Sequence, residues 1–242
     1  MVINTKHLYI INTSTTTMTQ IRTTQPSTED YFKHNNITQK TINDATNSLI
    51  EISNMRDKEY YESYYTKALD EFLISLDYKG HKKIYSKILK KIGIGKNILE
   101  SGYGSGILGC YIAKSNNQYK GIETNNFGYE MAKNRAKQNN LNPNIFELNN
   151  FFDYNNKHEI LLTCKFLGGN NFQPNKDRIK KATEISSHII GIEQIDFSDY
   201  EPSKLAQYKN EFKKHELNFE ILHEPIMSNG NNSKYFLFEA KK

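Results

Sequence analysis

The segment between Asn97 and Gly106 reads Asn-Ile-Leu-Glu-Ser-Gly-Tyr-Gly-Ser-Gly and is well suited to hold a ligand. An acid, Glu100, is followed by glycines at alternate positions, beginning with Gly102 and Gly104. Glycine allows positive φ and close approach of the backbone to a ligand, because it has no Cβ. A carboxylate beside such a loop would repel phosphate but would suit an ammonium group. The spacing also differs from the G-x-G-x-x-G of dinucleotide-binding loops.

Two further sets of polar residues follow apolar segments of the kind that form strands. Glu123 ends the segment Gln118–Glu123, and Asn149-Asn150-Phe151 follows the segment from residue 144 to 148. In doubly wound sheets an acid at the tip of the second strand accepts hydrogen bonds from ribose hydroxyls. The side-chain oxygen of Asn150 is a hydrogen-bond acceptor.

The order acid-x-Gly-x-Gly-x-Gly resembles motif I of the class I S-adenosylmethionine (SAM)-dependent methyltransferases. The resemblance implies that SAM is the cofactor, that Glu100 faces its α-ammonium group and that Glu123 binds its ribose. It also places Asn150 near the adenine amino group, although the family usually has an aspartate there. The expected cofactor-binding residues are Glu100, Ser101, Gly102, Tyr103, Gly104, Gly106, Glu123, Thr124, Asn149, Asn150 and Phe151.

The elements that must position these residues alternate between strand-like and helix-like segments. This alternation predicts an α/β fold, a doubly wound and mostly parallel sheet covered on both faces. Two final strands, 219–223 and 234–240, are joined by a loop that contains the turn dipeptide Asn229-Gly230. A C-terminal hairpin of this kind resembles the end of the methyltransferase fold, which implies seven strands with an antiparallel hairpin. The resemblance covers about residues 80–242.

The first part of the chain has a different character. Residues 1–28 are rich in threonine and are predicted to form a flexible tail, because they offer little apolar surface for burial. Residues 29–92 are expected to form an N-terminal helical extension, and residues 93–242 the SAM-binding domain. Tyr61 and Tyr65 lie four apart on one predicted helix, which either covers the domain or closes over the SAM pocket as a lid.

Catalytic residues are harder to predict, because methyl transfer mainly requires alignment of the acceptor. Thr163 and Lys165 lie at the end of the fourth predicted strand, at the edge of the sheet that would face the methyl group, and Glu193 and Asp196 follow the fifth strand at the same edge. Of these, Thr163 and Glu193 are candidate catalytic residues, together with Tyr61 and Tyr65. The Asn/Asp-Pro-Pro-aromatic motif of many amino methyltransferases is missing from the sequence after the fourth strand.

Composition also bears on metal binding, membrane spanning and nucleic-acid binding. The two cysteines lack metal-ligand spacing, so no metal is expected, and no apolar stretch is long enough for a membrane span. We therefore expect a cytoplasmic protein. The net charge of +5 comes from lysines scattered along the chain, which favours solvated surfaces over a nucleic-acid interface. The sequence does not indicate an oligomeric state.

These observations favour a methyltransferase that acts on a small molecule. Three alternatives remain open. One is transfer of the aminocarboxypropyl group of SAM, as in nicotianamine-synthase-like proteins, and another is methylation of RNA. The third is an inactive SAM-binding partner subunit. The acceptor atom cannot be read from the sequence.

Overall fold

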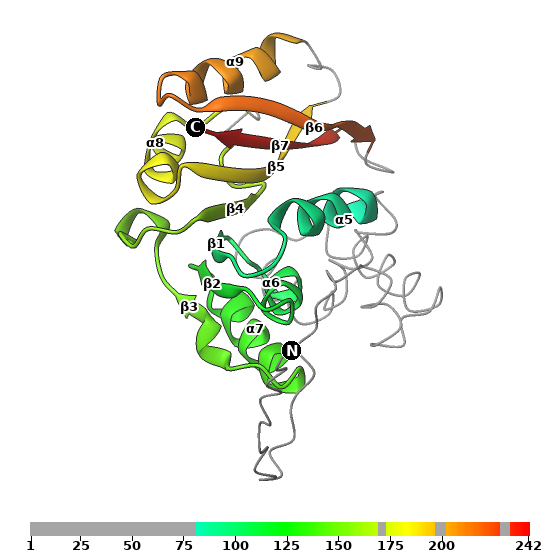
Figure 1. Ribbon diagram of the computed structural model, residues 1–242, viewed down its shortest axis with the longest axis vertical. Helices are drawn as coiled ribbons and strands as arrows, with labels where there is room; N and C mark the ends of the chain where they lie inside the picture. Colours follow the sequence, from blue (N-terminus) through cyan, green and yellow to red (C-terminus); the bar gives the residue numbers. More distant parts are fainter. Residues whose placement is uncertain (1–80, 169–172, 197–201, 228–232) are drawn as a thin grey trace, which may run out of the picture.

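The computed structural model describes residues 81–168, 173–196, 202–227 and 233–242. These form a seven-stranded sheet in the order β3-β2-β1-β4-β5-β7-β6, seen from one edge to the other in Figure 1. Strands β1 to β5 are parallel, and β7 runs antiparallel to both β5 and β6. The predicted fold class is thereby confirmed. The strands are β1 (Asn97–Ser101), β2 (Gln118–Glu123), β3 (Phe146–Leu148), β4 (Ile160–Cys164), β5 (His188–Asp196), β6 (Asn218–Met227) and β7 (Ser233–Lys241).

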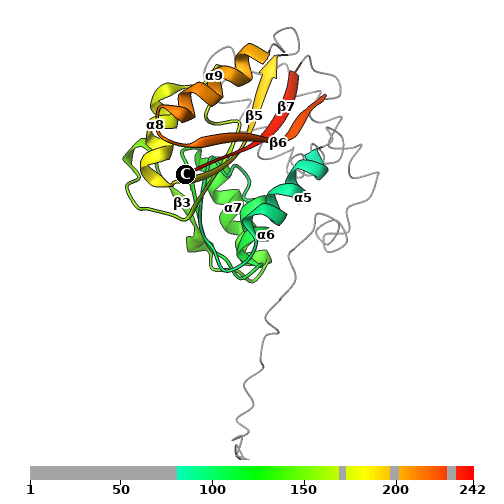
Figure 2. The ribbon, with the colours of Figure 1, turned by 45° about the horizontal axis from the view of Figure 1, so that its top comes forward.

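The helices cover the two faces of the sheet in separate groups (Figure 2). Helices α5, α6 and α7 contribute to one apolar cluster, and α8 and α9 contribute to the other. Each face of a parallel sheet is apolar and requires such a cover. The helices are α5 (His81–Ile92), α6 (Ile107–Ala113), α7 (Asn126–Gln138), α8 (Lys176–Ile185) and α9 (Pro202–Lys213).

Two strand boundaries differ from the prediction, one because of a local turn and one because of pairing with a distant strand. The third strand was expected from residue 144, but Pro143–Ile145 forms the 3-10 turn η1, which the side chain of Asn142 caps at Asn144 N. β3 therefore begins at Phe146. β5 includes Glu193 and Asp196, which were expected to follow the fifth strand, because β7 pairs with it from His188 to Asp196.

The crossover from β3 to β4 contains a 3-10 turn, η2 (Phe151–Asp153), where the other parallel crossovers contain α-helices. Phe151 and Tyr154 are buried against this part of the sheet in place of a helix. Beside them lies an open polar groove of about 610 Å³, lined by residues that include Lys120, Glu147 and His158. The sheet positions in the groove are polar, in keeping with their exposure to water.

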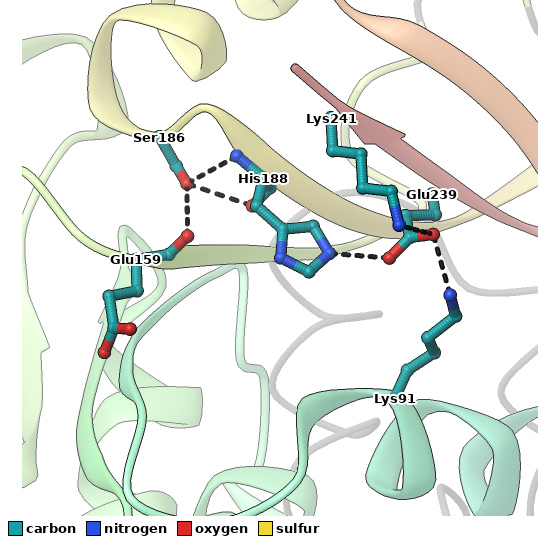
Figure 3. A network of polar contacts seen from close by, with 6 residues as sticks. All are labelled: Lys91, Glu159, Ser186, His188, Glu239 and Lys241. Atoms are coloured by element: carbon teal, nitrogen blue, oxygen red, sulfur yellow. Dashed lines mark hydrogen bonds and ion pairs between the residues drawn. The ribbon is translucent and has the colours of Figure 1, made fainter.

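Helix α5 is fixed to the sheet by a buried carboxylate, shown in Figure 3. Glu239 of β7 accepts hydrogen bonds from Lys91 at 2.8 Å and contacts Lys241 at 3.1 Å and His188 Nε2 at 2.8 Å. Burial alone would raise the pKa of Glu239, but these partners outweigh it and lower the pKa. Ile88 and Ile92 of α5 also lie in the main core. Thus α5 packs into the domain that we expected to begin at residue 93.

The other predictions for the N-terminal region lie outside the described residues. This applies to the tail, to most of the helical extension and to Tyr61 and Tyr65.

Candidate functional site

The glycine loop between β1 and α6 has the backbone conformation that its sequence predicts. Gly102, Gly104 and Gly106 have φ values of 74°, 55° and 72°. A Cβ on Gly106 would lie 2.6 Å from Ala132 Cβ, so the loop also packs too closely on α7 for a side chain. Gly102 N donates to Ile122 O at 2.9 Å, which fixes the start of the loop to β2.

Arg135 of α7 holds the same loop from the other side, a contact that the sequence analysis missed. Its Nε donates to Ser105 O at 3.1 Å, and the residue is buried. An arginine on the otherwise apolar face of a predicted helix was the available signal, because long charged side chains are rarely buried without a partner.

Glu123 joins the tip of β2 to the glycine loop. Its Oε2 accepts from Gly104 N at 3.1 Å, while Oε1 accepts from Thr124 N at 2.9 Å and Asn125 N at 3.0 Å. Each carboxylate oxygen has two acceptor sites, so acceptor capacity remains for a ligand. The structure therefore brings together the loop and the acid that we expected to share a ligand.

Glu100 lies beneath the loop in the core between the sheet and α6. It is 3% exposed, and its Oε2 accepts a hydrogen bond from the Tyr119 hydroxyl at 2.6 Å. Burial raises the pKa of Glu100 to about 7, against the lowering effect of the Tyr119 bond, and the nearby Glu123 carboxylate raises it further. The carboxyl group thus changes charge near neutral pH. Tyr119 received no role in the sequence analysis.

Two expected site residues, Ser101 and Tyr103, are buried. Ser101 is the buried last residue of β1. The ring of Tyr103 packs on Phe146, with a centroid distance of 4.7 Å, and its hydroxyl donates to Glu147 O at 3.3 Å. The Tyr103 side chain therefore lies in the core.

The expected adenine side of the site lies after β3. Asn149 N donates to Glu123 O at 2.9 Å, so this segment follows directly beside the tip of β2. The side-chain oxygen of Asn150 caps η2 by accepting from Phe152 N at 3.0 Å. An amide oxygen can accept two hydrogen bonds, so the cap leaves one acceptor site on Asn150. Its contact with adenine stays a prediction.

An aromatic wall, formed by Phe151, Phe152 and Phe166, connects η2 with the segment after β4. The Phe151 ring lies edge-on to Phe166 at 4.8 Å and to Phe152 at 5.9 Å. A Cβ on Gly102 would lie 3.9 Å from Phe166, which places this ring beside the glycine loop. The Arg178 guanidinium lies 4.9 Å from the centroid of Phe166. Phe166 was not among the predicted site residues, because the segment after the fourth strand lacks the Asn/Asp-Pro-Pro-aromatic motif.

The segment after β4 is held by a carboxylate that we had considered a catalyst. Glu193 Oε1 accepts from Phe166 N at 3.0 Å and Leu167 N at 2.7 Å, and Oε2 accepts from Gly168 N at 3.1 Å. Burial raises the pKa of Glu193 to about 7 despite these three bonds and the nearby Arg178. Glu193 therefore anchors the segment after β4 through these three hydrogen bonds. Its catalytic role stays a prediction.

The other residues expected near the acceptor occupy different surroundings. Thr163 is buried, and its Oγ1 has no hydrogen-bond partner among the described residues. A Cβ on Gly191 would lie 2.7 Å from that oxygen, which places the hydroxyl against β5. Lys165 is exposed and has a φ of 55°. A catalytic role for Thr163 stays a prediction, and the side chain of Asp196 is outside the description.

In the described part of the chain, no cluster of three or more His, Cys, Asp or Glu residues is placed to hold a metal ion. Within the same residues, no helix has the length and apolar character needed to cross a membrane.

Comparisons with known proteins agree with the architecture. No protein-family model matches the chain. It is 27% identical over 131 residues to the ribosomal RNA small subunit methyltransferase C of Psychromonas ingrahamii, a match that spans 48% of this chain and 38% of the relative. The matched segment thus spans well under half of that protein.

Solved structures resemble the chain over a larger part. The YcgJ protein of Bacillus subtilis has a TM-score of 0.52 at 12% identity, covering 65% of this chain and 97% of its own. A proposed RNA methyltransferase of Pyrococcus horikoshii has a TM-score of 0.51 at 15% identity, covering 82% and 98%. The N-terminal domain of EvdMO1, crystallised with S-adenosylhomocysteine and D-fucose, has a TM-score of 0.52 at 13% identity, covering 66% and 81%. With its strand order, its glycine loop and its C-terminal hairpin, this chain has the α/β fold of the class I SAM-dependent methyltransferases.

Proposed function

We propose that the protein binds SAM at the carboxyl ends of β1, β2 and β3 and transfers its methyl group to a small-molecule acceptor. The observation that carries the proposal is the junction of Glu123 with the glycine loop, through the 3.1 Å bond to Gly104 N. Ligands of open α/β sheets bind at this edge of the strands.

The residues present suit the parts of SAM. Oε2 of Glu123 has acceptor capacity left for a ribose hydroxyl, and the buried carboxyl of Glu100 can offset the charge of an ammonium group. The positive φ angles of Gly102, Gly104 and Gly106 open the backbone toward the methionine portion. Phe151 and Phe166 supply an apolar wall for adenine. When bound, SAM supplies an electrophilic methyl group attached to a sulfonium.

The contribution of the chain to transfer is alignment of the acceptor. An acceptor atom held about 3 Å from the methyl carbon and in line with the breaking bond reacts without covalent help from the protein. Glu193 and Arg178 serve this purpose by fixing the segment after β4. Arg178 Nη1 donates to Phe166 O at 2.7 Å and Gly168 O at 2.9 Å, so donors and acceptors of that segment are both held.

RNA methylation is the second candidate. Two of the similar proteins carry names that refer to RNA methylation, and the net charge of +5 is compatible with an RNA acceptor. The missing Asn/Asp-Pro-Pro-aromatic motif favours the small-molecule acceptor instead. Aminocarboxypropyl transfer differs from both in its by-product, which would be methylthioadenosine.

The test begins with calorimetric titration of the purified protein with SAM. Binding supports the proposal, and its absence over the micromolar to millimolar range would contradict it. SAM carrying a labelled methyl group is then incubated with a small-molecule extract and, separately, with total RNA. Label in a small molecule together with S-adenosylhomocysteine is expected. Label in RNA would favour the second candidate, and methylthioadenosine would indicate aminocarboxypropyl transfer.

A further inference from the structure

We propose that Tyr119 is a positioning residue for Glu100, and that this buried pair couples binding of the cationic methionine portion of SAM to release of a proton. The inference rests on the proposed function, because it assumes that SAM occupies the site. It adds a residue of β2 that does not touch the ligand and a dependence of cofactor affinity on pH.

The Tyr119 hydroxyl fits closely between α6 and β2. A Cβ on Gly109 would lie 2.2 Å from this oxygen, and a Cβ on Gly121 would lie 2.7 Å from it. Two glycines, one on α6 and one on β2, thus provide the space in which the hydroxyl sits. Its bond to Glu100 Oε2 measures 2.6 Å, typical of a short hydrogen bond between a hydroxyl and a carboxyl group.

Glu100 lies close to the glycine loop in the sequence and in the fold. The residue precedes Gly102 by two positions and lies on the same face of β1 as Ile98, facing the core beneath α6. Tyr119 bonds to Oε2 and does not use Oε1. We assign the second oxygen to the ammonium group of a ligand that rests on the glycine loop.

The groups that surround Glu100 do not include a compensating cation in direct contact among the described residues. From β2 it faces Tyr119 and the Glu123 carboxylate, and from α6 it faces the Cys110 thiol. Burial raises the pKa of Cys110 to about 12, so that thiol is neutral over the relevant range. Tyr103 from the loop raises the pKa of Tyr119. Arg135 from α7 lowers the pKa of Cys110, but the effect of burial is larger. An ammonium group from a ligand would supply the missing positive charge.

The direction of the pH effect follows from these surroundings. In the free protein the pKa of Glu100 is raised to about 7, so the carboxyl is largely protonated below that pH. A ligand ammonium favours the ionised form, and binding at lower pH therefore releases a proton. The affinity is expected to fall as the pH decreases below 7, by at most about tenfold for each pH unit, because a single proton is released. The α-amino group of the ligand, with an ordinary pKa of about 7.7–8.0, remains charged there.

The experiment compares two probe ligands on the wild-type protein by calorimetry between pH 5.5 and 7.5. SAM carries the α-ammonium group, whereas 5′-methylthioadenosine has the adenosine portion without it. We expect SAM affinity to decrease toward acid pH with uptake of the released proton by the buffer, and methylthioadenosine affinity to stay nearly constant. This comparison requires no variant. Parallel curves for the two ligands would overturn the coupling.

Tyr119→Phe then tests the positioning role, with Tyr208→Phe as a matched control. Tyr208 is also fully buried, but its hydroxyl has no hydrogen-bond partner in the described part of the chain. Because the Tyr119 bond lowers the pKa of Glu100, its loss should move the SAM affinity curve to higher pH, while Tyr208→Phe leaves the curve unchanged. A Tyr119→Phe curve that superposes on the wild-type curve would overturn the role of Tyr119 and leave the proposed function standing. Failure of the wild type to bind SAM at any pH would overturn both.

Discussion

The carboxylate of Glu123 and the backbone N–H of Gly104 are joined by a hydrogen bond of 3.1 Å. The bond connects the tip of β2 with the loop that follows β1, so the two elements lie side by side at the carboxyl edge of the sheet. The same carboxylate also binds the N–H groups of Thr124 and Asn125. Glu123 therefore fixes the conformation of the loop and of the β2 tip in the absence of a ligand.

Replacement of Glu123 should weaken SAM binding. Glu123→Ala removes a charged acceptor for ribose hydroxyls and releases the Gly104 contact, which is expected to cost roughly 2–4 kcal/mol, or about thirtyfold to several-hundredfold in affinity. Calorimetry measures the change. Glu130→Ala on α7 removes the same charge from an exposed position and serves as the control. Equal affinities of wild type and Glu123→Ala would refute the assignment of Glu123.

The glycine loop should tolerate a methyl group poorly at Gly106. Both Gly106 and Gly95 have a φ of 72°, but an added Cβ would meet Ala132 Cβ at 2.6 Å only at Gly106, whereas Gly95 has nothing within 4 Å. Gly95→Ala is expected to cost about 1 kcal/mol of unfolding free energy from backbone strain alone. Gly106→Ala should cost about 2–4 kcal/mol, because close packing adds to the strain. Urea denaturation tests the difference, and equal losses would contradict the packing argument.

Glu239 should contribute to stability in a pH-dependent manner. Glu239→Gln keeps the shape but removes the charge that binds Lys91 and Lys241, at an expected cost of about 1–2 kcal/mol, because both lysines can still reach water. The folded pKa is lowered, so this contribution is present above the ordinary glutamate pKa and is lost as the pH falls through the folded value. Unfolding at pH 7 and at pH 3 measures it. The exposed Glu184→Gln is the control, and an undiminished difference at pH 3 would argue against the ion pairs.

Loss of the carboxylate at Glu193 should loosen the segment after β4. In Glu193→Gln one oxygen becomes an amino group that cannot accept from a backbone N–H, so at least one of the three bonds is lost. We expect faster amide hydrogen exchange at Leu167 and Gly168 and lower turnover with the identified acceptor. Asp177→Asn at the first turn of α8 is the control, since it also neutralises an acid near this segment. Unchanged exchange at these amides would show that Glu193 is not their anchor.

Much of the architecture was predictable because its signals are local or periodic. Alternating strand-like and helix-like segments predicted the layers, and the glycine spacing predicted a loop with positive φ. The position of Glu123 at the end of a predicted strand was enough to place it at the carboxyl edge of the sheet, because the carboxyl ends of parallel strands lie at the same edge. The turn at Asn229-Gly230 suggested the final hairpin, whose two strands the structure confirms.

Other features depended on neighbours that are distant in the sequence. Tyr119 meets Glu100 because β1 and β2 pair in a register that places Ile98 beside Tyr119, and two glycines leave room for the hydroxyl. Arg135 reaches Ser105 only because α7 packs on the loop. Glu193 was interpreted as a candidate catalyst from its position after a predicted strand, but pairing of β5 with β4 brings its carboxylate to three backbone N–H groups. The sequence by itself determined which groups stand at the carboxyl edge of the parallel strands, because that follows from the order of elements. The tertiary structure decided which buried charges meet which partners, because hydrogen bonds require side chains from separate elements to come within about 3 Å of each other.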